Sequence, residues 1–226
     1  MSEPERIGAV VLAAGRSERM EYPKPLLVFG KETAVDRVIR ICMEAGCDPV
    51  VVVLGHEPDR IRRNARLKGA LAVVNEDYAS GQTSSLQAGL RALPEDVRAF
   101  LLFPVDHVMV RGETISALLE ARRVQGRAVT VPSLGGRRGH PALCDRTLIP
   151  EILALSSEEP ARAVTGRDPG RIFHLETEDA EVLRDLDTPA DYLDALEVYS
   201  QRGGEAGFLA PKGAGGRPAP KKPPVP

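Results

Sequence analysis

The strongest constraint on the fold is a repeated alternation of short apolar runs with segments of helical spacing. The run "IGAVVLAAG" ends in a glycine, and similar runs follow it; the expected strands are 7–15, 50–56, 71–74, 99–106 and 127–133. Continuous apolar runs are typical of strands buried on both faces of a parallel sheet. The helical segments between them are 33–45, 84–93 and 114–125. This alternation predicts an α/β fold with a Rossmann-like, doubly wound, mainly parallel sheet.

Polar residues gather where these runs end. The sequences there are "LAAGRSERM", "LGHEPD", "VNEDYASGQTSS" and "FPVDHV", which are rich in glycines, hydroxyls and acids. In open α/β sheets, ligands bind beyond the carboxyl ends of the strands. The sequence therefore places a functional site at this edge of the sheet.

Composition limits the class of protein. The chain has 226 residues, of which 42% are hydrophobic and 27% charged, which suits one domain with one core. Its formal net charge of −2 gives no overall attraction to nucleic acid or to an anionic membrane. The three cysteines, Cys42, Cys47 and Cys144, have no C-x-x-C spacing, so we expect neither a disulfide framework nor a zinc cluster. The first apolar run is too short for a signal peptide or a membrane span, and we expect a cytoplasmic protein.

A change of composition near residue 203 marks the expected end of the domain. The sequence "GGEAGFLAPKGAGGRPAPKKPPVP" is rich in glycine, proline and lysine and has no apolar period. Such a segment cannot bury enough apolar surface to fold. We therefore expect one domain over 1–202 and a disordered tail over 203–226, to which we assign no function.

The loop after the first run has the character of an anion site. Small residues at Ala13, Ala14 and Gly15 allow close approach to the backbone, whose amides can form an anion-binding nest. Arg16, Ser17 and Arg19 add donors. Lys24 stands between Pro23 and Pro25, which stiffen its backbone. These features predict a site for a polyanion such as a triphosphate, and the alternative is a basic surface loop. Neither the G-x-G-x-x-G nor the Walker pattern is present.

Asp106 is the candidate metal ligand. It follows the buried run "LLFPV", where an acid has no packing role and is costly unless it is paired or bound to a cation. Mg²⁺ is the natural partner of such a carboxylate in a site that also takes phosphate oxygens.

Several motifs resemble one family in order. The segments "LAAGRSERM", "PKPLL", "SGQTSSLQAGL", "FPVD", "RGHPAL" and "DLDTPADY" are similar to those of the MobA-like nucleotidyltransferases, above all the molybdenum cofactor cytidylyltransferases. The resemblance spans Ile7 to Tyr199. It implies a GT-A-like nucleotidyltransferase fold and transfer of a nucleoside monophosphate from an NTP to a small phosphate-bearing acceptor such as molybdopterin, with release of pyrophosphate. "LAAG" rather than "LAGG" favours CTP over GTP.

The resemblance also implies residue roles. Arg19, Lys24 and Asp106 would be catalytic, Asp106 and Asp187 would bind Mg²⁺ with Asp185 as a nearby substitute, and His140 would bind the second substrate. The implied nucleotide-binding residues are Leu12, Ala13, Ala14, Gly15, Arg16, Ser17, Arg19, Lys24, Gly81, Ser84 and Ser85. Two structural alternatives stay open: Asp187 as a helix N-cap before "TPADYLDAL", and His140 as the residue that holds the turn before Pro141.

The expected chemistry needs no strong general base, because a phosphate monoester with a second pKa of about 6 is already an anionic nucleophile at neutral pH. Positioning and charge neutralisation are then the main tasks of the protein. Two departures from the family pattern touch the expected active loops: Glu21 replaces a glycine and Val108 replaces a proline. Two further hypotheses therefore remain, transfer to another acceptor such as a sugar phosphate or methylerythritol phosphate, and a noncatalytic nucleotide-binding accessory protein.

Overall fold

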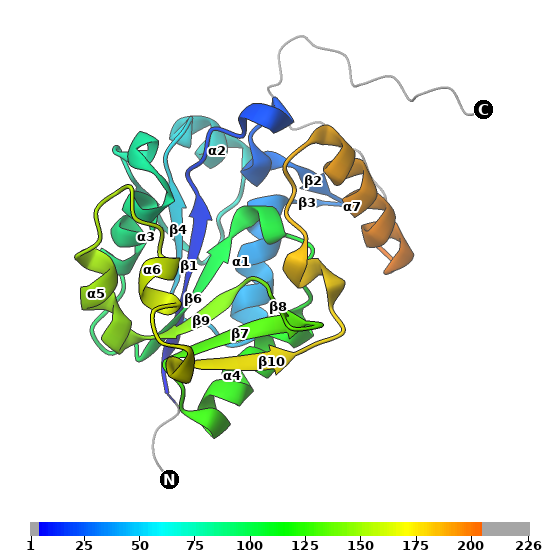
Figure 1. The fold of residues 1–226 in the computed structure, drawn as a ribbon. Coiled ribbons are helices and arrows are strands. Elements are labelled where there is room, and N and C mark those ends of the chain that lie inside the picture. The colour runs from blue at the N-terminus through cyan, green and yellow to red at the C-terminus, as the bar shows by residue number, and fades with distance from the viewer. Residues whose placement is uncertain (1–4, 205–226) are drawn as a thin grey trace, which may run out of the picture.

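A computed structural model describes residues 5–204, so most of the expected tail over 203–226 lies outside the described residues. The core is an eight-stranded sheet with the order β10-β7-β9-β6-β1-β4-β5, and β8 pairs with β7 (Figure 1). The strands of this sheet are β1 (Ile7–Ala13), β4 (Val50–Leu54), β5 (Leu71–Val74), β6 (Ala99–Pro104), β7 (Val129–Leu134), β8 (Arg137–Arg138), β9 (Ala142–Asp145) and β10 (Ile172–Glu176). A separate antiparallel pair consists of β2 (Val28–Phe29) and β3 (Glu32–Thr33).

The expected mainly parallel sheet is confirmed, with two antiparallel strands, β9 and the short β8. Strand β1 pairs in parallel with β4 and β6, and β4 pairs in parallel with β5. Strand β9 runs antiparallel between β6 and β7. Its sequence, "ALCD", is too short for a periodic signal, so this strand is not among the expected ones.

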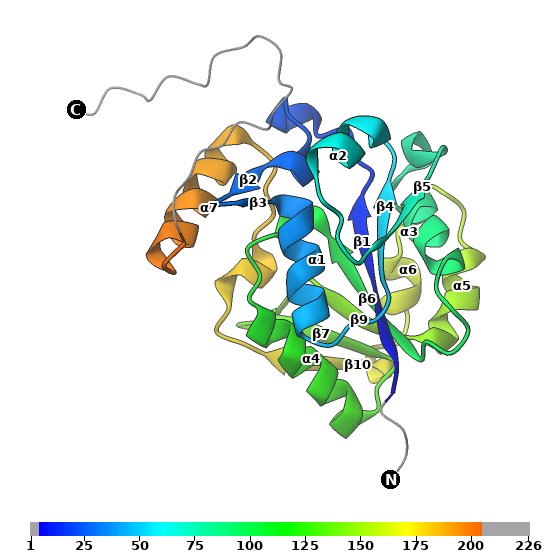
Figure 2. The same cartoon turned by 180° about the vertical axis from the view of Figure 1, so that it is seen from behind.

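The helices cover both faces of the sheet. They are α1 (Ala34–Glu44), α2 (Pro58–Asn64), α3 (Gln82–Arg91), α4 (Gly112–Gln125), α5 (Ile149–Leu153), α6 (Arg162–Thr165) and α7 (Pro189–Gln201). Helices α1 and α4 pack on one face, whereas α3, α5 and α6 lie on the other (Figures 1 and 2). In residues 5–204, no helix is long and apolar enough to cross a membrane.

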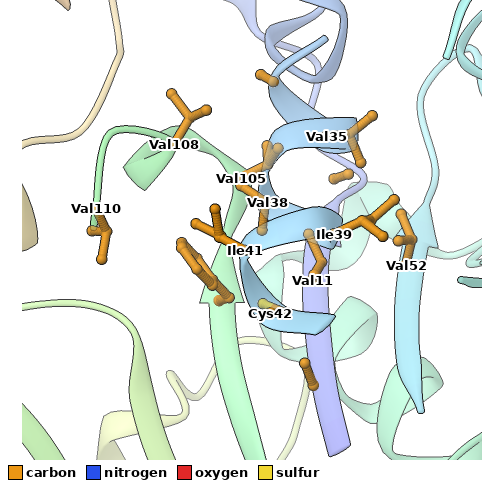
Figure 3. Close-up of a cluster of buried hydrophobic side chains, with 14 of the residues drawn as sticks. Val11, Val35, Val38, Ile39, Ile41, Cys42, Val52, Val105, Val108 and Val110 are labelled. Carbon is orange, nitrogen blue, oxygen red and sulfur yellow. The ribbon is translucent and has the colours of Figure 1, made fainter. Parts of the chain in front are cut away.

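Strand β1 contributes to two cores because its side chains alternate between the faces of the sheet. Val11 packs with the α1 residues Val35 and Val38 (Figure 3). Val10 belongs to the second cluster, on the α3 side. Helix α3 comes close to the sheet there, since a Cβ on its Gly89 would lie 2.4 Å from Cγ1 of Val10.

The expected helices are present with shifted ends. Thr33 is the N-cap of α1, and its hydroxyl accepts a hydrogen bond from the amide of Asp36 at 3.3 Å. Helix α3 begins at Gln82, two residues before the expected start, because Gly81 leaves the helical region with a φ of 118°. Strand β6 ends at Pro104, and Asp106 lies in the short 3-10 helix Val105–His107 that follows.

Candidate functional site

A cavity of about 640 Å³ opens at the carboxyl edge of the sheet, where the strands β1, β5 and β6 end. We call it the carboxyl-edge cavity. Its lining comprises Leu12, Ala13, Ala14, Gly15, Arg16, Ser17, Glu18, Arg19, Lys24, Pro25, Tyr78, Gly81, Gln82, Ser85, Pro104, Val105, Asp106 and Asp187. Most of the expected nucleotide and metal residues therefore meet in one place, but Ser84 and His140 are not among the lining residues.

The charged residues of the cavity form one cluster. Lys24 Nζ donates a hydrogen bond to Asp187 Oδ1 at 2.7 Å and lies 3.3 Å from Asp106 Oδ2. Arg19 Nη2 lies 2.7 Å from Asp187 Oδ2. Lys24 and Asp187 are 163 positions apart in the chain, so only the fold brings them together.

The carboxylates of Asp106 and Asp187 differ in their hydrogen-bond partners. The hydrogen bond from Lys24 lowers the pKa of Asp187, so this group is ionised at neutral pH. Asp106 Oδ1 is buried and has no hydrogen-bond partner among the described residues. A buried carboxylate oxygen is costly without a donor or a cation. The pair therefore fits a cation shared with phosphate oxygens, although residues 5–204 contain no cluster of three or more His, Cys, Asp or Glu arranged for a metal.

Local hydrogen bonds fix the loop that carries Lys24. Ser17 adopts the left-handed conformation with a φ of 56°, and its hydroxyl accepts a hydrogen bond from the Lys24 amide at 3.0 Å. Lys24 then begins the short 3-10 helix Lys24–Leu26, with Pro25 in its first turn. The stiff backbone expected from the flanking prolines is thus tied to the loop after β1.

The N-cap interpretation of Asp187 is wrong. Thr188 is the N-cap of α7, in a capping box with Asp191. Asp191 Oδ2 accepts hydrogen bonds from the amides of Thr188 at 2.7 Å and Asp187 at 3.0 Å. Because the cap is supplied by its neighbour, the Asp187 carboxylate is available to Lys24 and Arg19.

Some lining residues have no counterpart in the sequence analysis. Tyr78 and Gln82 line the cavity, and the single tyrosine in "NEDYASG" was the only signal available for the first. Ser84, which was expected among the nucleotide-binding residues, stabilises this loop, and its role toward the nucleotide stays a prediction. Its hydroxyl lies 2.8 Å from the carbonyl oxygen of Gly81 and accepts a hydrogen bond from Asn75 Nδ2 at 2.9 Å.

His140 lies beside His107 rather than in the cavity lining. The two ring centroids are 4.7 Å apart, and both Nδ1 atoms are buried without a hydrogen-bond partner in the described part of the chain. Burial lowers the pKa of His107, and burial together with His107 lowers the pKa of His140 to about 4. Both rings are therefore neutral at pH 7, and the acceptor role of His140 stays a prediction.

The two departures from the family pattern lie outside the cavity lining. Glu21 is exposed and adopts a φ of 55°, the left-handed conformation that favours glycine. Val108 is fully buried, and its carbonyl accepts a hydrogen bond from Arg37 Nε at 3.1 Å. Neither residue is part of the charged cluster.

The chain has an open α/β sheet, and an arginine, a lysine and two carboxylates lie together beside the small-residue loop at its carboxyl edge. This arrangement is typical of a nucleotide-binding α/β protein. More specifically, the chain belongs to the MobA-like NTP transferase family, whose model matches residues 9–172, and it is a nucleotidyltransferase. The match covers the loop after β1 and Asp106 but ends before Asp187.

Individual relatives cover most of the chain. It is 31% identical over 190 residues to the nicotine blue oxidoreductase of Paenarthrobacter nicotinovorans, covering 80% of this chain and 92% of that protein. It is 26% identical over 196 residues to the molybdenum cofactor cytidylyltransferase of Escherichia coli K12, covering 86% and 98%. Among solved structures, the manganese complex of Rv0371c from Mycobacterium tuberculosis H37Rv matches with a TM-score of 0.74 and 25% identity, covering 86% of this chain and all of that one.

Proposed function

We propose that the protein transfers a nucleoside monophosphate, CMP in preference to GMP, from an NTP to a small phosphate-bearing acceptor, with molybdopterin as the expected acceptor. The observation that carries this proposal is the contact of Lys24 with both Asp106 and Asp187 beside the small-residue loop. The similarity to a molybdenum cofactor cytidylyltransferase supports the choice of CTP and of molybdopterin.

Charge neutralisation is the main contribution of the chain in this proposal. The backbone at Ala13, Ala14 and Gly15 lines the cavity and leaves room for phosphates. Arg19 and Lys24 supply the positive charge that a triphosphate requires. Both are already held by Asp187, so they are positioned before the ligand arrives.

The bond changes are simple. A phosphate oxygen of the acceptor attacks the α-phosphorus of the NTP, and the bond from that phosphorus to the α–β bridging oxygen breaks. The departing electron pair stays on pyrophosphate. The acceptor is already an anion at neutral pH, because the second pKa of a phosphate monoester is about 6. Arg19 and Lys24 stabilise the leaving pyrophosphate, and no side chain has to remove a proton.

A divalent metal fits the two carboxylates. Asp106 Oδ1 is buried without a partner, and Asp187 is ionised because of Lys24. Bound there, Mg²⁺ would add positive charge against the phosphate oxygens. The manganese complex of the M. tuberculosis relative supports a divalent metal, and we propose Mg²⁺ as the physiological ion.

The proposal is tested by thermal shift and by pyrophosphate release. CTP, GTP, ATP and UTP are added with and without Mg²⁺ to the wild type, to Asp106→Asn and to the control Asp59→Asn, which alters an exposed aspartate on α2. A ligand at 100 times its Kd adds about 2.7 kcal/mol, which raises Tm by roughly 5–10 °C. We expect a selective, Mg²⁺-dependent response to CTP that only Asp106→Asn abolishes. No response to any NTP would refute the triphosphate site.

Further ligands separate the other hypotheses. If pyrophosphate were released with a sugar phosphate or methylerythritol phosphate but not with molybdopterin, the acceptor would be one of those phosphates rather than molybdopterin. Nucleotide binding without turnover on any acceptor would indicate a noncatalytic accessory protein. NADH and NADPH belong in the panel because one relative is named an oxidoreductase. The cytoplasmic location and the domain limits stay predictions.

A further inference from the structure

The aromatic side chain of the carboxyl-edge cavity is Tyr78, and no other Phe, Tyr or Trp occurs among the residues that line it. His56 Nδ1 lies 3.3 Å from the Tyr78 hydroxyl. The guanidinium carbon of Arg16 lies 5.9 Å from the centroid of the Tyr78 ring. The ring is therefore held at its hydroxyl end and has a cation over one face.

The position of Tyr78 depends on a glycine. A Cβ on Gly55 would lie 2.5 Å from Cβ of Tyr78, 2.7 Å from its Cγ and 2.8 Å from Cβ of Ala14. Such distances are well inside van der Waals contact, so only glycine leaves room for the tyrosine against the loop after β1. Residues that follow the strands β1, β4 and β5 thus fix one aromatic ring at the cavity.

The cavity has two chemically different ends. Asp106 and Asp187, with Lys24 between them, lie beyond β6, whereas Tyr78 lies beyond β5. In the sheet, β6 and β5 are separated by β1 and β4. The Tyr78 side chain reaches back to Gly55 after β4 and Ala14 after β1, so it lies on the β4 side of the loop after β1, whereas Asp106 lies on the β6 side. A ligand that uses both ends carries anionic groups at one end and a flat apolar group at the other.

We propose that Tyr78 and Arg16 form the wall that binds the nucleobase of the NTP, with the base inserted between the ring and the guanidinium. This inference rests on the proposed function, which already places the triphosphate at the charged end. Arg16 can accommodate a base because its side chain is 54% exposed and its nearest carboxylate, Glu18, is 3.8 Å away. Aromatic stacking accepts any base, so the wall sets the affinity for the nucleoside part rather than the choice of base.

The test compares a ligand that has a base with one that lacks it. Dissociation constants for CTP and for inorganic tripolyphosphate are measured by calorimetry on the folded full-length protein with Mg²⁺. Tyr78→Ala should weaken CTP binding about tenfold, within the range known for base stacking, and leave tripolyphosphate binding unchanged. Tyr78→Phe keeps the ring and should bind CTP within about twofold of the wild type.

A further variant distinguishes a binding wall from a structural role. Tyr22→Ala is the matched control, since Tyr22 also has an arginine, Arg60, 5.2 Å above its ring but does not line the cavity. Tyr22→Ala should change neither the dissociation constant for CTP nor that for tripolyphosphate. Thermal unfolding shows whether each variant is folded at the temperature of the titration.

The outcomes are distinct. Equal weakening of CTP and tripolyphosphate by Tyr78→Ala would show that the ring only supports the loops, and would overturn the inference. Unchanged CTP binding in Tyr78→Ala would overturn it as well. If the wild type bound tripolyphosphate and CTP with equal affinity, the base would add nothing to binding. That result would overturn the inference but leave the triphosphate site intact. If the wild type bound neither ligand, the proposed function would fail and this inference with it.

Discussion

Replacing Glu21 with glycine should stabilise the protein although it removes a side chain. Glu21 ends the 3-10 helix Glu18–Met20 with a φ of 55° and a ψ of 10°. An L-residue other than glycine pays roughly 1–2 kcal/mol in this left-handed conformation. The Glu21 side chain is exposed and makes no hydrogen bond or ion pair with the described residues, so its removal costs no contact.

The opposing contribution is the greater freedom of glycine in the unfolded chain, about 0.5–1 kcal/mol. The difference predicts that Glu21→Gly stabilises the fold by roughly 0.5–1 kcal/mol. In a domain of this size, that change raises Tm by roughly 1–4 °C. The same substitution at Glu18, which lies inside the 3-10 helix and not in the left-handed region, has the entropic cost and loses an exposed ion pair with Arg16 at 3.8 Å, which contributes little. Glu18→Gly should therefore lower the stability by about 0.5–1 kcal/mol.

The assay is urea denaturation of the wild type, Glu21→Gly and Glu18→Gly without ligand. The deciding result is which of the two variants has the higher free energy of unfolding, because both remove an exposed glutamate side chain from the same loop. Equal destabilisation by the two substitutions would show that the conformation of Glu21 carries no strain. Asn, which tolerates the left-handed region, should give an intermediate stability at position 21.

The remaining predictions concern packing, capping and pH. Gly89→Ala should destabilise the fold by about 1–2 kcal/mol in urea denaturation, because its Cβ would meet Val10 at 2.4 Å and overpacking outweighs the gain in helix propensity. Thr188→Ala should cost about 1 kcal/mol through loss of the α7 cap, and Thr188→Ser should restore most of it. The pKa of His140 is lowered from 6.5 to about 4, so its contribution to stability is complete above pH 6.5 and is lost as the pH falls toward 4. Urea denaturation with a chelator present should therefore show that, between pH 7.5 and pH 5, the free energy of unfolding falls by about 2 kcal/mol more in the wild type than in His140→Gln. Parallel pH profiles of the two proteins would contradict this.

The parallel core could be predicted because burial on both faces forces a continuous apolar run. β1, β4 and β6 each show such a run, and all three are adjacent interior strands of the sheet. β9 could not be predicted in the same way, since four residues give no usable period. Its antiparallel place between β6 and β7 depends on long-range pairing rather than on local sequence.

The candidate site was predictable in parts. The loop after β1 and Asp106 follow from the rule that polar residues at strand ends mark a ligand site. The contact of Lys24 with Asp187 could not be derived from spacing, because 163 positions separate them, and only the resemblance to a family assigned both residues to one site. Tyr78 was missed because one aromatic residue in a loop belongs to no periodic pattern. Asp187 was open to two interpretations until the cap was found at Thr188.

Because alternate side chains of β1 pack in two different cores, the strand cannot tolerate an insertion of one residue. Side chains on a strand repeat every second residue, so a one-residue insertion within β1 would exchange the occupants of the two cores. The same insertion would move Ala13 and Gly15 one step along the strand axis, about 3.3 Å, relative to Lys24 and Asp106. Folding and ligand geometry therefore depend on one register. Insertions and deletions should therefore be absent between Ile7 and Lys24, the stretch that sets this register and holds Lys24 in place.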